Sequence, residues 1–187
     1  MIISGERVNI RAIEYEDLDF LKDIMNSPEL EKMENGFYFP VSRGRQEQWY
    51  QEYLRSQSDN RFIIETKEGR QIGYTCLLNI DWKNRKAHTG IKLYGMENYG
   101  KGFGTDSVLS IMKFAFYEMQ LNRLEGFIID YNHASKKLYL DKCGWKIEGV
   151  QREAVFKNGQ YHDLIMVASL KSEFIETNTV NTEESIF

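Results

Sequence analysis

The clearest chemical potential lies in a glycine-rich segment, GMENYGKGFGTDS, at residues 95–107. Glycine backbone can turn sharply and approach a ligand closely, because no Cβ atom stands in the way. A loop of free N–H groups that leads into the start of a helix attracts anions, since the helix dipole and the unpaired donors point the same way. The segment therefore predicts a phosphate site, with its core at Gly100, Lys101, Gly102, Phe103 and Gly104.

Two familiar phosphate motifs fit this segment poorly. The dinucleotide pattern G-x-G-x-x-G fails, because Gly102 is followed by Gly104 and then by Thr105 where the third glycine should stand. A Walker loop nearly fits Gly95 and the Gly100-Lys101 pair, but Gly102 occupies the place of the Ser or Thr that binds magnesium. A magnesium-dependent nucleotide enzyme is therefore the weakest reading.

Two segments together resemble the GNAT acetyltransferase superfamily. Its motif Q/R-x-x-G-x-G/A matches Tyr99 to Gly104, with Tyr99 in place of Gln or Arg. Further along, Asn132, Ser135 and Tyr139 match the pattern N-x-x-S-x-x-x-Y, and a K-x-G-W stretch at residues 142–145 follows. The resemblance covers roughly residues 6–170 and is to the branch with ribosomal-protein alanine and polyamine acetyltransferases.

This resemblance implies acetyl-CoA as co-substrate, without a metal ion. Its diphosphate would rest on the N–H groups from Gly100 to Thr105, and its pantetheine arm would pair like an added strand beside Leu93 and Tyr94. Asn132 and Ser135 could instead be only a helix cap. The residues expected at the cofactor are Leu93, Tyr94, Gly100, Lys101, Gly102, Phe103, Gly104, Thr105, Asn132 and Ser135.

The implied reaction is N-acetylation by direct attack of an amine on the thioester. A primary amine with a pKa of about 10 must lose a proton before it attacks, and the leaving thiolate must gain one. Tyr139 stands at the family's usual acid position, and His88 stands where relatives often carry a Glu base. A water chain could replace a single base, and three carboxylates are weaker alternatives: Asp130, Asp81 and Glu34.

The acceptor side is less defined than the cofactor side. The family commonly builds its acceptor pocket where this chain has Phe37, Tyr38, Phe39 and Trp49, although these rings could equally pack two helices together. Residues 161–163 could line the same mouth. A polyamine, a protein N-terminus, another small amine or a nucleotide-linked amino sugar all remain open. A non-catalytic CoA-binding sensor or scaffold on the same fold is the alternative function.

The elements that must position these residues alternate along the chain. Strands are expected over residues 7–13, 61–66, 71–80, 87–95, 123–130, 145–150, 153–157 and 161–170, and helices over 16–26, 43–56, from 105 onward and over 133–143, with a short helical piece after Ser27. Thr105 or Asp106 suits the first turn of its helix, Gly144 a helix end, and Asn158-Gly159 a hairpin turn. The fold class is α/β with a mixed, mostly antiparallel sheet. The resemblance implies about seven strands, splayed between the fourth and the fifth, with helices on both faces.

Length and composition set outer limits. The 187 residues predict one domain over residues 1–170, followed by a frayed acidic tail at residues 171–187. A formal charge of −4 argues against nucleic-acid binding, and no stretch is apolar enough for a membrane span, so we expect a cytoplasmic protein. Neither the cysteines nor the histidines have metal-site spacing. Similar proteins often form homodimers, but no residue here specifies a contact surface.

Overall fold

The computed structural model describes residues 1–36 and 39–174. One eight-stranded sheet runs through it in the order β1-β2-β3-β4-β5-β6-β8-β7. The strands are β1 (Ile3–Ser4), β2 (Val8–Ala12), β3 (Asn60–Thr66), β4 (Gln71–Asp81), β5 (Lys86–Leu93), β6 (Arg123–Ile129), β7 (Lys146–Lys157) and β8 (Gln160–Leu170). The helical elements are η1 (Tyr15–Asp17), α1 (Leu18–Met25), α2 (Pro28–Glu31), α3 (Arg43–Tyr53), η2 (Met96–Asn98), α4 (Phe103–Lys113), η3 (Phe114–Glu118), α5 (His133–Lys136) and η4 (Lys137–Lys142).

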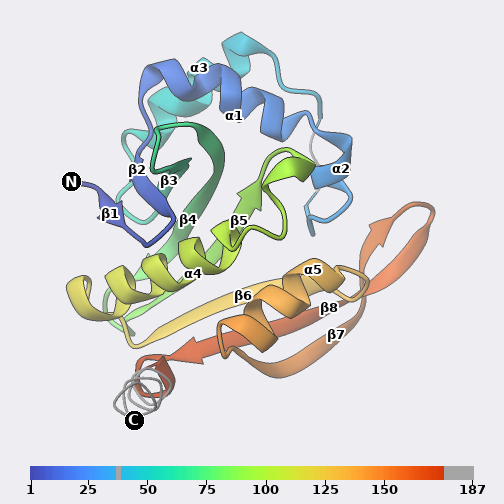
Figure 1. Cartoon of the computed structure of the whole chain (residues 1–187). Helices are drawn as coiled ribbons and strands as arrows, with labels where there is room; N and C mark the ends of the chain where they lie inside the picture. The colour runs from blue at the N-terminus through green and yellow to red at the C-terminus, as the bar shows by residue number, and fades with distance from the viewer. Residues whose placement is uncertain (37–38, 175–187) are drawn as a thin grey trace.

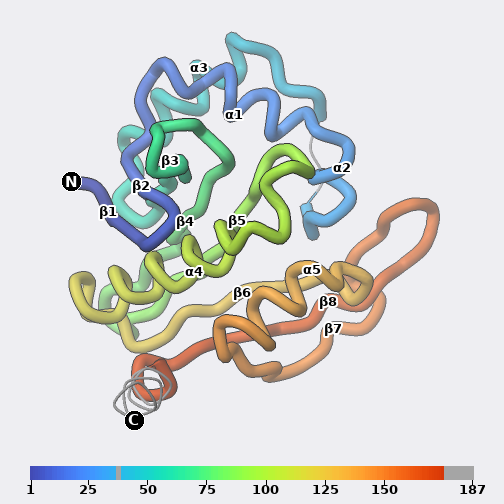
Figure 2. The backbone as a smooth tube through the Cα atoms, in the orientation of Figure 1, coloured from blue at the N-terminus to red at the C-terminus, as the bar shows by residue number. Residues whose placement is uncertain are grey.

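The sheet opens between β5 and β6, as the family resemblance implied. These are the only parallel neighbours among the described strands, and they pair only at Lys86–Arg123, Ala87–Leu124 and His88–Glu125. Beyond His88 the two strands diverge, so that an upper half from β1 to β5 and a lower half of β6, β8 and β7 face each other across a gap (Figure 1). The tube view shows the same divergence, with α2 above the lower half on the open side (Figure 2).

Two apolar cores lie on the two faces of the upper half, and the one under α4 continues into the lower half. Helices α1 and α3 pack on one face, where Leu18, Ile24 and Ile63 are buried. The other face carries α4 and its continuation η3, whose apolar stripe includes the buried Val108 and Phe116. This stripe confirms the helical periodicity read from the sequence, although α4 begins at Phe103 rather than at Thr105.

The β7–β8 hairpin turns where the sequence predicted. Asn158 and Gly159 both have positive φ, 52° and 82°, which is the conformation a tight hairpin requires. The expected strands at 145–150 and 153–157 are one strand, because bulges near Gly149 and Gln151 absorb the irregular residues without ending the pairing with β8.

The predicted frayed tail is wrong for its first residues. Residues 171–174 form a helical turn, and Phe174 is buried against the rings of Phe116 and Tyr117 at 5.5 and 6.0 Å. An apolar ring near the end of the last strand can therefore join the core. The rest of the predicted tail, residues 175–187, lies outside the described residues.

None of the helices that the structure describes is both long and apolar enough to cross a bilayer. Within the same residues, no three His, Cys, Asp or Glu side chains gather closely enough to bind a metal ion. The predicted domain limit at residue 170 stays a prediction.

Candidate active site

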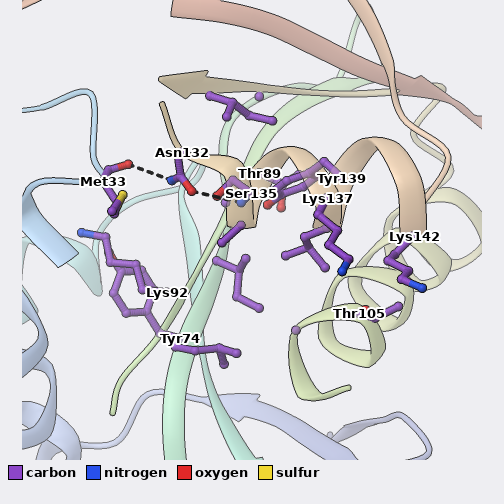
Figure 3. Close-up of a pocket in the computed structure, with 18 of the residues that line it drawn as sticks. Met33, Tyr74, Thr89, Lys92, Thr105, Asn132, Ser135, Lys137, Tyr139 and Lys142 are labelled. Atoms are coloured by element: carbon purple, nitrogen blue, oxygen red, sulfur yellow. Dashed lines mark hydrogen bonds between the residues drawn. The ribbon is translucent and has the colours of Figure 1, made fainter. Parts of the chain in front are cut away.

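A cavity of about 1840 Å³ occupies the opening between β5 and β6. Its wall includes β4, β5, β6, the glycine loop, the segment around α2, and the helix formed by α5 and η4 (Figure 3). Three predicted cofactor residues do not line it: Tyr94, Lys101 and Phe103. The predicted site residues that do line it are His88, Leu93, Gly100, Gly102, Gly104, Thr105, Asn132, Ser135 and Tyr139.

The glycine loop has the geometry of an open anion cradle. Gly100 and Gly102 have φ of 74° and 82°, a left-handed conformation that other residues adopt only with strain. Helix α4 follows at once and has no side-chain cap at Gly102. The backbone N–H groups from Gly100 to Thr105 donate to no acceptor within the described residues. An anion could therefore accept hydrogen bonds from several of these N–H groups at once.

Asp106 keeps this helix start open by pointing elsewhere. Its carboxylate accepts three backbone N–H groups from the entry to β2: Glu6 at 3.0 Å, Arg7 at 2.7 Å and Val8 at 2.9 Å. The expectation that Asp106 serves its own helix is therefore wrong. The three donors also offset a negative charge that would otherwise oppose an anion at the loop.

Cationic side chains lie near the loop, and the sequence analysis predicted a role for none of the three described next. Arg7 lies so close to Gly102 that a Cβ there would stand 3.2 Å from its Cδ and Nε atoms. Lys137 and Lys142 extend from the α5–η4 helix toward the start of α4 (Figure 3). Arg7 comes from the first turn of the chain, and no motif links it to the loop. Its role can be seen only from the fold.

The backbone of β5 divides the predicted pair Leu93 and Tyr94. The Tyr94 N–H donates to the carbonyl of Ile72 at 2.8 Å, and its carbonyl accepts from Asn98 Nδ2 at 2.5 Å. The Tyr94 N–H is therefore already used in the sheet, and the place of Tyr94 at the cofactor stays a prediction. Backbone groups alternate sides along a strand, so Leu93 faces the opening, where its carbonyl accepts from Tyr99 Oη at 3.2 Å.

Asn132 serves the architecture through both ends of its amide. Its Oδ1 caps the helix by accepting the Ser135 N–H at 3.0 Å, and its Nδ2 donates to the Met33 carbonyl at 3.3 Å (Figure 3). Asn132 is thus a helix cap, and because it also lines the cavity, its place at the cofactor stays a prediction. The Ser135 hydroxyl, by contrast, bonds to no described residue and lines the cavity.

Tyr139 lies on the π-helical turn η4 and is only 7% exposed. Its ring meets Trp145 edge to face at 5.0 Å, and no described residue hydrogen-bonds its hydroxyl. Burial raises the pKa of this phenol well above its usual range, and nearby thiols and the Glu34 carboxylate act in the same direction. The hydroxyl therefore stays protonated beside the cavity, as a proton donor must.

His88 lines the cavity from the last position at which β5 pairs with β6. Its Nε2 lies 3.4 Å from Glu125 Oε1, and its ring stacks on Phe127 at 5.5 Å. Burial acts to raise the pKa of Glu125, but hydrogen bonds from Lys86 and Arg123 outweigh it, and the net shift is downward. The imidazole therefore has an ionised partner, while its role as base stays a prediction.

Of the alternative bases, only Glu34 lines the cavity. Its carboxylate lies 3.5 Å from Lys92 Nζ, and Figure 3 shows Lys92 beside Met33 and Tyr74. Burial lowers the pKa of Lys92, partly offset by the Glu34 charge. Asp81 instead caps the β4–β5 turn through Asn84, and Asp130 pairs with His162 at 3.3 Å.

Of the four aromatic residues expected at the acceptor, the two that the structure describes do not form its wall. Phe37 and Tyr38 lie outside the described residues, and Phe39 and Trp49 do not line the cavity. Trp49 stacks on Tyr53 of the same helix at 5.4 Å and packs against the core beneath α1 and α3. Residues 161–163 also lie away from the cavity. The wall at this end comes instead from the α2 segment: Glu29, Leu30, Met33, Glu34 and Asn35.

A splayed mixed sheet, a glycine loop before α4 and a cavity in the splay define an acetyltransferase of the GNAT class. The acetyltransferase (GNAT) domain model matches residues 7–146 of this chain. The chain therefore belongs to the GNAT acetyltransferase family, and it is an N-acetyltransferase.

Proteins similar to this chain are also named N-acetyltransferases. An N-acetyltransferase of Bacillus licheniformis, p20, is 33% identical over 172 residues, covering 90% of this chain and 96% of that protein. A spermidine N(1)-acetyltransferase of Vibrio cholerae is 26% identical over 172 residues, covering 91% and 97%. The crystal structure of spermidine N-acetyltransferase from Vibrio cholerae, in complex with CoA and spermine, has a TM-score of 0.84 and 25% identity, with 90% and 98% covered.

Proposed function

We propose that this protein transfers the acetyl group of acetyl-CoA to a primary amine of a small cationic acceptor, with a polyamine as the leading class. The observation that carries the proposal is one cavity with anion-binding groups at one end and carboxylates at the other. Arg7, Lys137 and Lys142 join the free N–H groups of the glycine loop at the first end. Glu29 and Glu34 stand at the second, where the Lys92 ammonium lies 3.5 Å from Glu34.

The cationic end suits the phosphates of CoA. Left-handed glycines, an uncapped 11-residue helix and a nearby guanidinium supply donors that converge without a competing side chain. The acidic end suits an acceptor that is charged in solution. The relatives that act on spermidine support a polyamine over the other amines.

The residues between the two ends can manage the protons of the transfer. Acetyl-CoA supplies the thioester whose C–S bond breaks as the acceptor nitrogen bonds to the acetyl carbon. Tyr139 holds a proton that its hydroxyl can give to the departing sulfur. His88, or Glu34 through water, can take the proton that the amine loses.

A thiol-release assay with acetyl-CoA tests the proposal. Spermidine, an alanine N-terminal peptide and an amino sugar linked to a nucleotide are compared as acceptors at equal concentration, and calorimetry measures acetyl-CoA binding separately. We expect acetyl-CoA to bind and spermidine to give the highest kcat/KM. Turnover with the peptide alone would change the acceptor class, and failure of the folded protein to bind submillimolar acetyl-CoA would overturn the proposal.

The alternative, a non-catalytic CoA sensor or scaffold, makes a different prediction in the same assay. It requires acetyl-CoA binding without release of thiol for any amine tested.

A further inference from the structure

The cavity's acidic end is fastened across the opening by side chains from the other half of the molecule. We name residues 31–36, which begin at the last residue of α2, the strap. Its carbonyl groups accept three side-chain donors from the lower half: Tyr131 Oη to Lys32, Asn132 Nδ2 to Met33 at 3.3 Å, and Lys157 Nζ to Glu31 and Gly36. In Figures 1 and 2, α2 lies above the end of the lower half that carries α5.

Lys157 makes the most extensive of these contacts. Its ammonium lies 3.0 Å from the Glu31 carbonyl and 2.7 Å from the Gly36 carbonyl, and it also pairs with the Glu31 carboxylate. An ammonium has three N–H donors, so this set of acceptors uses all of them. The side chain is only 7% exposed, although it stands at the end of β7, most of whose residues are exposed.

The strap offers backbone carbonyl groups that a buried cation can bind. Helix α2 ends at Glu31, and the last carbonyls of a helix have no partners within it. Lys157 donates to the last of these carbonyls, that of Glu31, which also accepts the Glu34 N–H at 3.2 Å, and Tyr131 and Asn132 donate to carbonyls just beyond the helix. The strap also carries Met33 and Glu34, both of which line the cavity, and Glu34 pairs with Lys92 on β5.

We infer that Lys157 is a positioning residue for the acceptor end: it holds the strap, and through it Glu34, in place across the opening. Lys157 does not line the cavity and touches no reacting atom. Its loss should therefore loosen the acceptor wall while leaving the glycine loop as it is. The kinetic part of this inference rests on the proposed function, whereas the structural part does not.

The test compares Lys157→Met with Lys146→Met. Lys146 lies on the same strand, but its side chain is 67% exposed and pairs with Glu173, which does not line the cavity. With spermidine as the probe, we expect Lys157→Met to raise the acceptor KM about tenfold, at unchanged acetyl-CoA KM. Lys146→Met should leave both KM values unchanged.

Hydrogen exchange decides the structural part even if no acceptor turns over. Amides over residues 29–36 should exchange faster in Lys157→Met, while those of residues 99–106 should not change. Glu31→Gln removes the carboxylate charge but keeps the carbonyl acceptors, so it should increase exchange over residues 29–36 by less than Lys157→Met does. This variant replaces Lys157→Met in the test if Lys157→Met does not fold. Unchanged exchange over residues 29–36, or an equal rise in both KM values, would overturn the inference.

Discussion

The two ends of the cavity are built in different ways. The cofactor end consists largely of consecutive residues, from Gly100 to Thr105, whose backbone offers the donors. The acceptor end consists of side chains from separate segments, with Glu34 held by a strap that Tyr131, Asn132 and Lys157 fasten. A ligand shared by many relatives can be bound by backbone alone, whereas a particular acceptor requires side chains that each protein can vary.

Tyr139 stands between the two ends, and its replacement should have the largest effect. We expect Tyr139→Phe to lower kcat about 100-fold or more, because the departing thiolate loses its proton donor, while acetyl-CoA binding and acceptor KM stay unchanged. Pre-steady-state and steady-state kinetics measure this. Tyr117→Phe, at a ring that does not line the cavity, is the control. An unchanged kcat would remove Tyr139 from the mechanism.

The pH dependence of the wild-type enzyme sharpens the role of Tyr139. Burial raises the pKa of its phenol above the ordinary value of about 10, so the donating, protonated form persists to higher pH than in a free tyrosine. The kcat profile should therefore show no loss assignable to Tyr139 as the pH rises from 8 to about 10. A fall in kcat near pH 9 that disappears in Tyr139→Phe would contradict this prediction.

Gly102→Val should damage the cofactor end alone. At φ of 82° a β-branched residue is strained, and its Cβ would press on Arg7 at 3.2 Å. We expect acetyl-CoA affinity to fall about 30-fold by calorimetry, with unchanged hydrogen exchange in the strap. Gly44→Ala on α3, where a Cβ meets nothing within 4 Å, controls for glycine replacement as such. Equal loss of affinity in both variants would refute a cradle at Gly102.

Arg7→Gln should have the smallest effect of the series. Removing one guanidinium beside the loop should weaken acetyl-CoA binding about tenfold and reduce the salt dependence of that binding. The backbone N–H of Arg7 still holds Asp106, so the fold should persist. Arg45→Gln, at an exposed residue of α3, should leave the affinity unchanged. If the two variants bind acetyl-CoA equally well, Arg7 does not contact its phosphates.

Much of the molecule was decided by residues close together in sequence. The glycine loop, the Asn158-Gly159 turn, the cap at Asn132 and the apolar stripe of α4 all depend on local backbone preferences or on a repeating period. The family motifs lie in two such segments. For that reason the fold class, the activity and the position of the glycine loop at the cavity could be predicted before any coordinates.

Only the tertiary structure decided which distant groups meet. Asp106 binds the backbone at residues 6–8, Arg7 reaches Gly102, and Lys157 reaches the strap, although nothing in the spacing of these residues links them. The pairing of Tyr94 with Ile72 likewise depends on strand register, which a single strand does not reveal. Local sequence sets dihedral angles and periodicity, whereas such contacts depend on how the whole chain packs, and the acceptor end is made almost entirely of them.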